Sequence, residues 1–214
     1  MRGLAVILHS PRKSSIHYKK MEKVANHHKA PRRFNILLDL DNTLISSLAK
    51  HEEKPIFKPR MKQFRWENME GAYKVFERPG LQEFLDFLFK NFNVSVWTAA
   101  SKSYAVFIID EFILKGHPER QLDYVLFSYH CKQSKRLRDT QKALNILKDE
   151  FKLLNFNMDR TYIIDDHPEV HSSQPDNCIA VKAFEFADRK SYEDRELELN
   201  VRPRLEAILE RSIY

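Results

Sequence analysis

Short apolar runs along the chain are separated by segments in which apolar residues recur at helical spacing. The runs cover residues 34–38, 94–97, 124–127, 162–164 and 178–181. The first of them, which ends in an aspartate, is typical of a strand buried on both faces of a parallel sheet. We therefore expect a strand at each of these five positions.

The segments between these runs indicate helices. The clearest helix opens after Arg78-Pro79-Gly80 and has five apolar residues on one face: Leu81, Phe84, Leu85, Leu88 and Phe89. Residues 104–114 and 205–209 are also expected to be helical. Asp139 or Thr140 is expected to cap a further helix with four apolar residues on one stripe: Leu144, Leu147, Phe151 and Leu154. Strands that alternate with helices predict an α/β fold with a doubly wound parallel sheet.

Charge is distributed unevenly along the chain. The formal net charge is +6, yet residues 1–33 carry nine Lys or Arg side chains and one Glu, which gives this segment +8 and the remainder −2. We interpret residues 1–33 as a basic N-terminal arm, either a solvated tail or a contact for nucleic acid or an anionic membrane surface. Residues from about 46 to 75 are polar and basic with scattered aromatic side chains, and are expected to form an insertion of loops or a small hairpin.

The cysteines and the N-terminal segment bear on the compartment. Cys131 and Cys178 form no CxxC pair, so a reducing compartment, the cytoplasm or the nucleus, is expected. The apolar run at residues 4–8 is too short for a secretory signal peptide or a membrane span, and neither is expected. We expect a monomer.

Polar residues follow three of the predicted strands directly. Asp39, Thr98 and Asp165 each stand at the end of an apolar run. In doubly wound sheets the ligand lies at the carboxyl ends of the strands. The three side chains are therefore expected to meet at one edge of the sheet and to form a functional site there.

Asp39-Leu40-Asp41-Asn42-Thr43 is the most informative segment for chemistry. Two carboxylates two residues apart can divide the work of phosphate transfer. One attacks phosphorus and forms an aspartyl phosphate, and the other protonates the leaving oxygen and later activates water. Crowded acids and a phosphate require a hard cation, so we expect Mg²⁺, with Asp166 as a further oxygen ligand.

A bound phosphate also needs hydrogen-bond donors and a positive charge near its oxygens. The Thr98 hydroxyl, next to backbone N–H groups at a predicted helix start, is expected to bind it. A lysine is also expected, and Lys142 and Lys148 compete for that role. Lys142 lies near the predicted helix start, whereas Lys148 lies ~9 Å further along the axis, so Lys142 is favoured.

These segments together resemble a known family. Asp39-Leu40-Asp41-Asn42-Thr43-Leu44 is similar to the DxDxT motif of the haloacid dehalogenase superfamily. The chain most resembles the branch that contains the RNA polymerase II C-terminal-domain phosphatases and their NLI-interacting-factor-like relatives. Further matching segments are Arg78-Pro79-Gly80-Leu81-Gln82-Glu83-Phe84-Leu85, Val96-Trp97-Thr98-Ala99-Ala100-Ser101, Ile163-Ile164-Asp165-Asp166-His167-Pro168, the stretch from Pro175 to Phe184, and Asp194-Arg195-Glu196-Leu197.

The resemblance implies a Rossmann-like phosphatase domain at residues 34–214, with the insertion at about 46–75 in place of a large cap. It implies that Asp39 is the nucleophile and Asp41 the general acid/base, that Thr98 binds phosphate, and that Lys142 is the site lysine. It also implies that Mg²⁺ is bound by three residues: Asp39, the Asp41 carbonyl and Asp166. The family commonly has Asp-Asn where this chain has Asp165-Asp166.

The resemblance and the short insertion favour a phosphoprotein substrate, because a site without a large cap admits a protein loop. The sequence does not separate phosphoserine or phosphothreonine from phosphotyrosine. A small-molecule phosphomonoesterase and a non-catalytic protein-binding scaffold on the same fold are the alternatives. The intact Asp39, Asp41, Thr98 and Asp166 argue against the scaffold, and the net negative charge of residues 34–214 argues against a large nucleic-acid-binding face.

Overall fold

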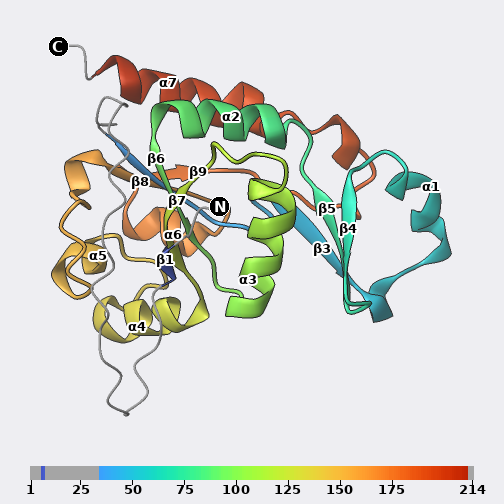
Figure 1. Ribbon diagram of the computed structural model, residues 1–214, viewed down its shortest axis with the longest axis horizontal. Coiled ribbons are helices and arrows are strands. Elements are labelled where there is room, and N and C mark those ends of the chain that lie inside the picture. Colours follow the sequence, from blue (N-terminus) through green and yellow to red (C-terminus); the bar gives the residue numbers. More distant parts are fainter. Residues whose placement is uncertain (1–5, 8–33, 212–214) are drawn as a thin grey trace.

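The central sheet of the molecule is parallel throughout. The computed structural model describes residues 6–7 and 34–211. Six strands make up the sheet: β1 Val6–Ile7, β2 Asn35–Leu38, β6 Asn93–Trp97, β7 Leu122–Leu126, β8 Thr161–Asp165 and β9 Cys178–Ala180. Their order is β1-β7-β6-β2-β8-β9, and every neighbouring pair is parallel (Figure 1). The five strands expected from the apolar runs and the α/β fold class are confirmed.

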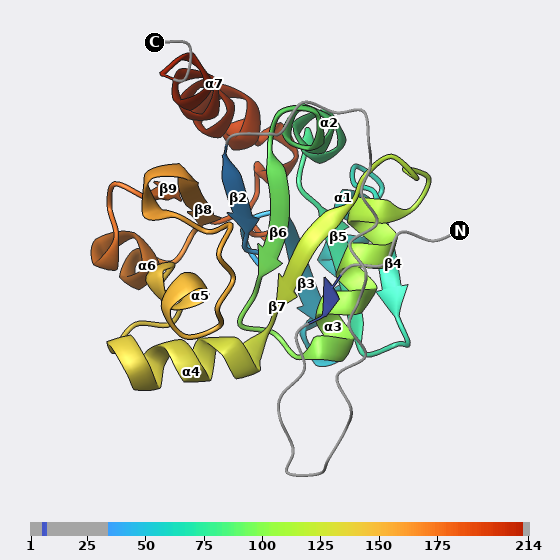
Figure 2. The ribbon, with the colours of Figure 1, turned by 60° about the vertical axis from the view of Figure 1, so that its left-hand side comes forward.

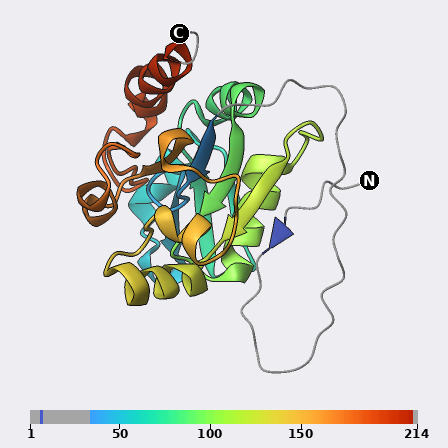
Figure 3. The ribbon, with the colours of Figure 1, turned by 90° about the vertical axis from the view of Figure 1, so that its left-hand side faces the viewer.

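Helices cover both faces of this sheet. The elements packed on one face are α2 Leu81–Asn91, α3 Lys102–Ile108, its π-helical continuation η3 Ile109–Leu114, the π-helical η6 Leu197–Val201 and α7 Arg202–Glu210. Those on the other face are α4 Ser128–Arg138, α5 Asn145–Asp149 and α6 Pro168–Ser173 (Figures 2 and 3). Alternate residues of β2 enter the two cores, because successive side chains of a strand point to opposite faces. Ile36 and Leu38 pack with the first set of helices, and Leu37 packs with the second.

The insertion is a small antiparallel sheet with a core of its own. Its elements are β3 Ile45–Ala49, the 3-10 turns η1 Lys50–Glu52 and η2 Pro55–Phe57, α1 Lys58–Met61, β4 Trp66–Met69 and β5 Tyr73–Glu77. The strand order is β3-β5-β4, on the right of Figure 1. Phe76 stacks on Phe186 with 3.6 Å between the ring centroids, which ties the insertion to the C-terminal part of the chain. The expected hairpin is therefore β4 and β5, and β3 adds a third strand to it.

The expected helix after residue 139 is wrong in its extent. Asp139 ends α4 with a positive φ of 57°, and α5 begins only at Asn145. Leu144 and Leu147 are buried as expected, but Leu154 is 78% exposed. The stripe of apolar residues thus crosses a short helix and the loop that follows it.

Outside the insertion, two helices were not expected from the sequence. Helix α4 is rich in basic and polar residues, and its buried residues are His130, Cys131 and Ser134, so it lacks an apolar stripe. Helix α6 is short and opens with Pro168, which suits the first turn of a helix. The remaining 3-10 turns are η4 Met158–Arg160 and η5 Ser191–Glu193.

The N-terminal arm lies outside the described residues except at Val6–Ile7. These two residues form β1, which pairs in parallel with Tyr124 and Val125 of β7. The sequence predicts no strand before residue 34, so β1 is an addition to the expected sheet. None of the helices in the described ranges is long and apolar enough to cross a membrane.

Candidate active site

The loop after β2 folds back on itself and fixes Asp39 at the carboxyl edge of the sheet. The Asp39 amide donates to the carbonyl of Ile164 at 3.0 Å, which extends the pairing of β2 with β8 by one residue. Leu40 is fully buried, and its carbonyl accepts from the amide of Ile45 at 3.1 Å. Asn42 has a positive φ of 57°, a conformation that asparagine tolerates better than most residues. The turn is thus anchored by burial and by main-chain hydrogen bonds.

A buried lysine lies between two carboxylates at this edge. Lys142 Nζ is 2.5 Å from Asp39 Oδ1 and 2.7 Å from Asp165 Oδ2. The side chains of Lys142, Asp39 and Asp165 are only 4%, 8% and 0% exposed. Burial acts to lower the pKa of Lys142, but the two carboxylates outweigh burial and raise that pKa above its ordinary value, so the lysine stays charged. Lys148, the competing residue, is exposed on α5.

Three carboxylates at this edge form a group that suits a hard cation. Oxygen atoms of Asp39, Asp165 and Asp166 lie within 4.8 Å of one another. The Thr43 hydroxyl is 3.3 Å from Asp39 Oδ2 and 3.2 Å from Asp166 Oδ1. Burial raises the pKa of Asp39 to about 6 against the effect of Lys142, and burial also raises the pKa of Asp166. Three carboxylates lie around one lysine, and a donor set made of oxygens fits Mg²⁺.

The carboxylates of Asp165 and Asp41 each have hydrogen-bond donors of their own. Asp165 was not expected to be a ligand, and both of its oxygens have partners: Lys142 on Oδ2 and the His167 amide, at 2.9 Å, on Oδ1. The Asp41 carboxylate lies outside the three-carboxylate group and accepts a 2.6 Å hydrogen bond from the Tyr104 hydroxyl. If Asp41 binds the metal, its main-chain carbonyl is therefore the group to do so, and its carboxylate stays available for proton transfer.

Burial raises the pKa of the Asp41 carboxyl to about 6, although the hydrogen bond from Tyr104 opposes this shift. A carboxyl with a pKa near neutrality can both give and accept a proton. Tyr104 was not expected at the site. The signal for it was its position in the first turns of a helix that follows a strand end, six residues after Thr98.

Thr98 lies at the end of β6, the strand beside β2. It is 1% exposed, and its amide donates to the Leu126 carbonyl at 3.0 Å. Its hydroxyl oxygen accepts from the Ala100 amide at 3.0 Å, which leaves the hydroxyl hydrogen to donate. Its neighbours thus hold the Thr98 hydroxyl in an arrangement that suits a hydrogen-bond donor to phosphate.

Arg78 joins the loop after β2 to the C-terminal part of the chain. Its side chain is completely buried and makes a two-pronged contact with Asp194, with both N···O distances at 2.9 Å. It also donates to the Thr43 carbonyl at 2.9 Å. Thr43 in turn contacts Asp39, so Arg78 supports the turn that carries the candidate nucleophile.

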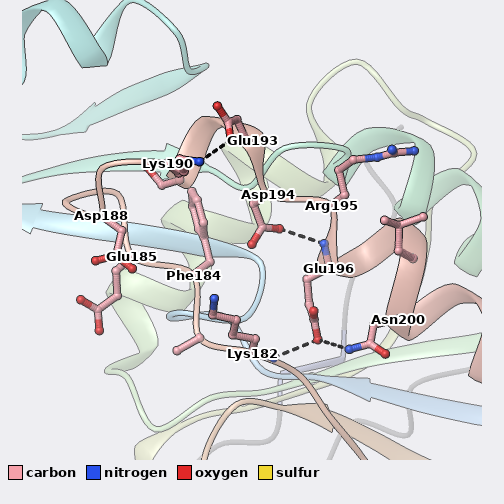
Figure 4. Close-up of a pocket in the computed structure, with 13 residues that line it drawn as sticks. Lys182, Phe184, Glu185, Asp188, Lys190, Glu193, Asp194, Arg195, Glu196 and Asn200 are labelled. Carbon is pink, nitrogen blue, oxygen red and sulfur yellow. Dashed lines mark hydrogen bonds and ion pairs between the residues drawn. The ribbon is translucent and has the colours of Figure 1, made fainter.

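A cavity of about 510 Å³ lies in the C-terminal part and is distinct from this carboxylate cluster (Figure 4). All of its lining residues fall between Lys182 and Asn200, and none is a predicted site residue. Asp194 is shared between the cavity wall and the pair with Arg78. The cavity wall is joined to the loop after β2 by this ion pair and by the amide of Phe184, which donates to the Asn42 carbonyl at 2.7 Å.

The family that this chain matches and its relatives in two iridescent viruses are phosphatases or phosphatase-like proteins. A family model described as NLI interacting factor-like phosphatase matches residues 34–212. The CTD phosphatase-like protein of Invertebrate iridescent virus 6 is 50% identical over 168 residues, which are 76% of this chain and 92% of that protein. Its counterpart in Invertebrate iridescent virus 3 is 43% identical over 178 residues, or 80% of this chain and 94% of that protein.

More distant matches agree in fold. The structure of Fcp1, an essential RNA polymerase II CTD phosphatase, superposes with a TM-score of 0.50 at 22% sequence identity. The match covers 83% of this chain and 49% of that one. It supports the Rossmann-like haloacid dehalogenase fold that the sequence predicts.

Proposed function

Because this chain belongs to the NLI interacting factor-like phosphatase family, and is on that ground a phosphoric monoester hydrolase, we propose that it is a magnesium-dependent phosphoprotein phosphatase that works through an aspartyl phosphate. The observation that carries the proposal is the buried group in which Lys142 lies between Asp39 and Asp165, with Asp166 at its edge. Removing a charged group from water costs on the order of several kcal/mol, so this buried group of charged side chains is expensive for the fold.

The first half of the proposed reaction is attack by a carboxylate oxygen of Asp39 on phosphorus. The bond between phosphorus and the leaving oxygen breaks, and the Asp41 carboxyl gives its proton to that oxygen. Lys142 keeps the Asp39 carboxylate oriented and offsets negative charge as it develops. The Thr98 hydroxyl donates to a phosphoryl oxygen.

The second half is hydrolysis of the aspartyl phosphate. The Asp41 carboxylate, now without its proton, takes one from a water molecule, and the water oxygen attacks phosphorus. Inorganic phosphate leaves and the Asp39 carboxylate is restored. Asp39, Asp166 and the Asp41 carbonyl would hold Mg²⁺, which when bound neutralises phosphoryl oxygens and so lowers the barrier to attack by an anion.

The insertion and the relatives support a phosphoprotein substrate. The insertion is a three-stranded sheet with one short helix, and it takes the place of a large cap, so a protein loop can reach the carboxylate edge. The viral relatives are CTD phosphatase-like proteins, and the Dictyostelium discoideum relative, 29% identical, is a C-terminal domain small phosphatase. Phosphoserine, phosphothreonine and phosphotyrosine peptides are all candidates.

A panel of phosphopeptides and phosphorylated metabolites tests this proposal. With Mg²⁺ the protein should release phosphate from peptides of at least one phosphoamino acid, and excess EDTA should stop the release. Added Mg²⁺ should restore it and Ca²⁺ should restore little, because the looser and higher coordination of Ca²⁺ misplaces the nucleophile. Release from metabolites alone would favour the small-molecule phosphomonoesterase, and equal rates in EDTA would refute the need for a metal.

A further inference from the structure

We propose that Tyr104 is a positioning residue for Asp41, and that the insertion holds Tyr104 in place. This inference rests on the proposed function, in which Asp41 is the general acid/base. Tyr104 contacts Asp41 directly, through a hydrogen bond from its hydroxyl to Asp41 Oδ1 of 2.6 Å. In the described part of the chain, no second hydrogen bond to the Asp41 carboxylate accompanies it.

Tyr104 is itself firmly held. It is 9% exposed, in the first turn of α3, and its amide donates to the Ser101 hydroxyl that caps this helix. A phenol keeps its proton at neutral pH, since its ordinary pKa is about 10, so the Tyr104 hydroxyl can donate to the Asp41 carboxylate.

One residue of the insertion contacts this tyrosine directly. The Tyr73 ring, on β5, meets the Tyr104 ring edge-to-face at 5.7 Å between centroids and 82° between planes. The insertion therefore contacts the residue that donates to the Asp41 carboxylate.

The chemical consequence concerns which carboxyl oxygen carries the proton. A carboxyl on a short side chain can rotate, and only one of its oxygens can serve the leaving group at a time. With Oδ1 engaged by Tyr104, Oδ2 is the oxygen left to carry the proton to the leaving oxygen. Loss of the phenol hydroxyl removes this constraint without removing the acid.

The test compares two aryl phosphates that differ in their need for an acid. The 4-nitrophenolate group leaves readily without a proton, whereas the phenolate of phenyl phosphate leaves poorly. Tyr104→Phe keeps the ring against Tyr73, and it should lower kcat/KM about tenfold for phenyl phosphate and less than about threefold for 4-nitrophenyl phosphate. An equal loss on both substrates would overturn the proposal.

A double-mutant cycle with Asp41→Asn separates positioning from a general structural effect. If Tyr104 acts through Asp41, Tyr104→Phe should have no further effect in the Asp41→Asn background. A full additional loss there would also overturn the proposal. Tyr124→Phe is the control, since that hydroxyl contacts Asn155 on the other side of the sheet at 3.4 Å, and it should match wild type on both substrates.

Two matched variants in the insertion test whether it supports Tyr104. Tyr73 and Trp66 are equally exposed, at 38% and 37%, but Trp66 contacts Phe76 and Lys74 rather than Tyr104. Tyr73→Ala should give a weaker form of the Tyr104→Phe pattern, with the larger loss on phenyl phosphate, and Trp66→Ala should not. If wild type and Asp39→Asn hydrolyse both substrates alike, it is the proposed function that fails, and not the assignment of Tyr104.

Discussion

Two charged regions of this molecule differ in how their charges are held. In the carboxylate cluster, Lys142, Asp39 and Asp165 come from distant parts of the chain and are at most 8% exposed. The cavity between residues 182 and 200 is also lined by many charged side chains, but apart from the Asp194–Arg78 pair, the ion pairs that its lining residues make in the described part of the chain are local and solvated. Arg195 pairs with Glu198, three residues on, and the two side chains are 60% and 55% exposed.

The difference shows that charge density alone does not identify a site. An exposed pair contributes little because water and salt screen it, whereas a buried charge without its partner is costly. Asp194 lines the cavity and pairs with the buried Arg78, outside the carboxylate cluster.

The largest effect is expected at the nucleophile. Asp39→Asn keeps the size of the side chain but removes the attacking carboxylate, so kcat should fall at least about 10⁴-fold. Hydrolysis of 4-nitrophenyl phosphate measures the loss, and a circular dichroism spectrum like that of wild type shows that the fold is intact. Activity retained by pure Asp39→Asn protein would contradict the mechanism.

The next largest effect separates the two lysines. Lys142→Ala removes the cation between Asp39 and Asp165 and should lower kcat about a hundredfold or more. Lys148→Ala removes an exposed charge and should stay within about twofold of wild type. The reverse ranking in the same assay would place the site lysine on α5.

A third comparison contrasts two arginines near the cavity. Arg78→Met leaves the Asp194 carboxylate, whose side chain is 15% exposed, without its partner, and should lower the free energy of unfolding by about 3 kcal/mol. Arg195→Met removes an exposed pair and should have no measurable effect on unfolding. Urea denaturation of both variants decides, and equal stabilities would show that the buried pair is not the stronger support.

The smallest effect is a dependence of stability on pH that originates in burial. Burial lowers the pKa of His130 from 6.5 to about 4, so the folded protein disfavours its protonation. The contribution is fully present above pH 6.5 and is lost as pH falls toward 4, by about 1 to 2 kcal/mol between pH 7 and pH 5. Urea denaturation of wild type and His130→Gln measures it as the difference between the two proteins.

Asp39 and Asp41 contribute a pH dependence of opposite sign, because their raised pKa values lie in the same range. Both proteins share this contribution, so it cancels when the stability of His130→Gln is subtracted from that of wild type. The exposed His171 is the control, and His171→Gln should show the pH dependence of wild type. If His130→Gln does the same, the dependence does not originate at His130.

The sheet was predictable from the sequence because its strands are buried on both faces. An apolar run such as 34–38 can be recognised without knowing which strand it pairs with. Each of the five predicted strands lies within a residue or two of the strand in the structure. Helix α4 was missed because its packing uses His130 and Cys131 rather than an apolar stripe. The third strand of the insertion was missed because its pairing with β5 joins segments more than 20 residues apart.

The candidate site was predictable where residues follow strands. Asp39, Thr98 and Asp165 come together because parallel strands end at the same edge. Lys142 was favoured because a helix was expected to begin near it. The helix begins later, at Asn145, but the loop before it still brings Lys142 to the same edge. Tyr104 was not predictable, because its contact with Asp41 depends on how α3 packs beside the insertion.

Strand β1 has a practical consequence for handling the protein. The family match begins at residue 34, and a shortened chain that begins there would lack Val6–Ile7. The outer edge of β7 would then present unpaired N–H and C=O groups, and open edges of this kind recruit strands from other molecules. Chemistry at Asp39 would be unaffected, since β7 lies two strands from β2. The shortened protein should instead be recognised by its tendency to self-associate at the concentrations used for crystallisation.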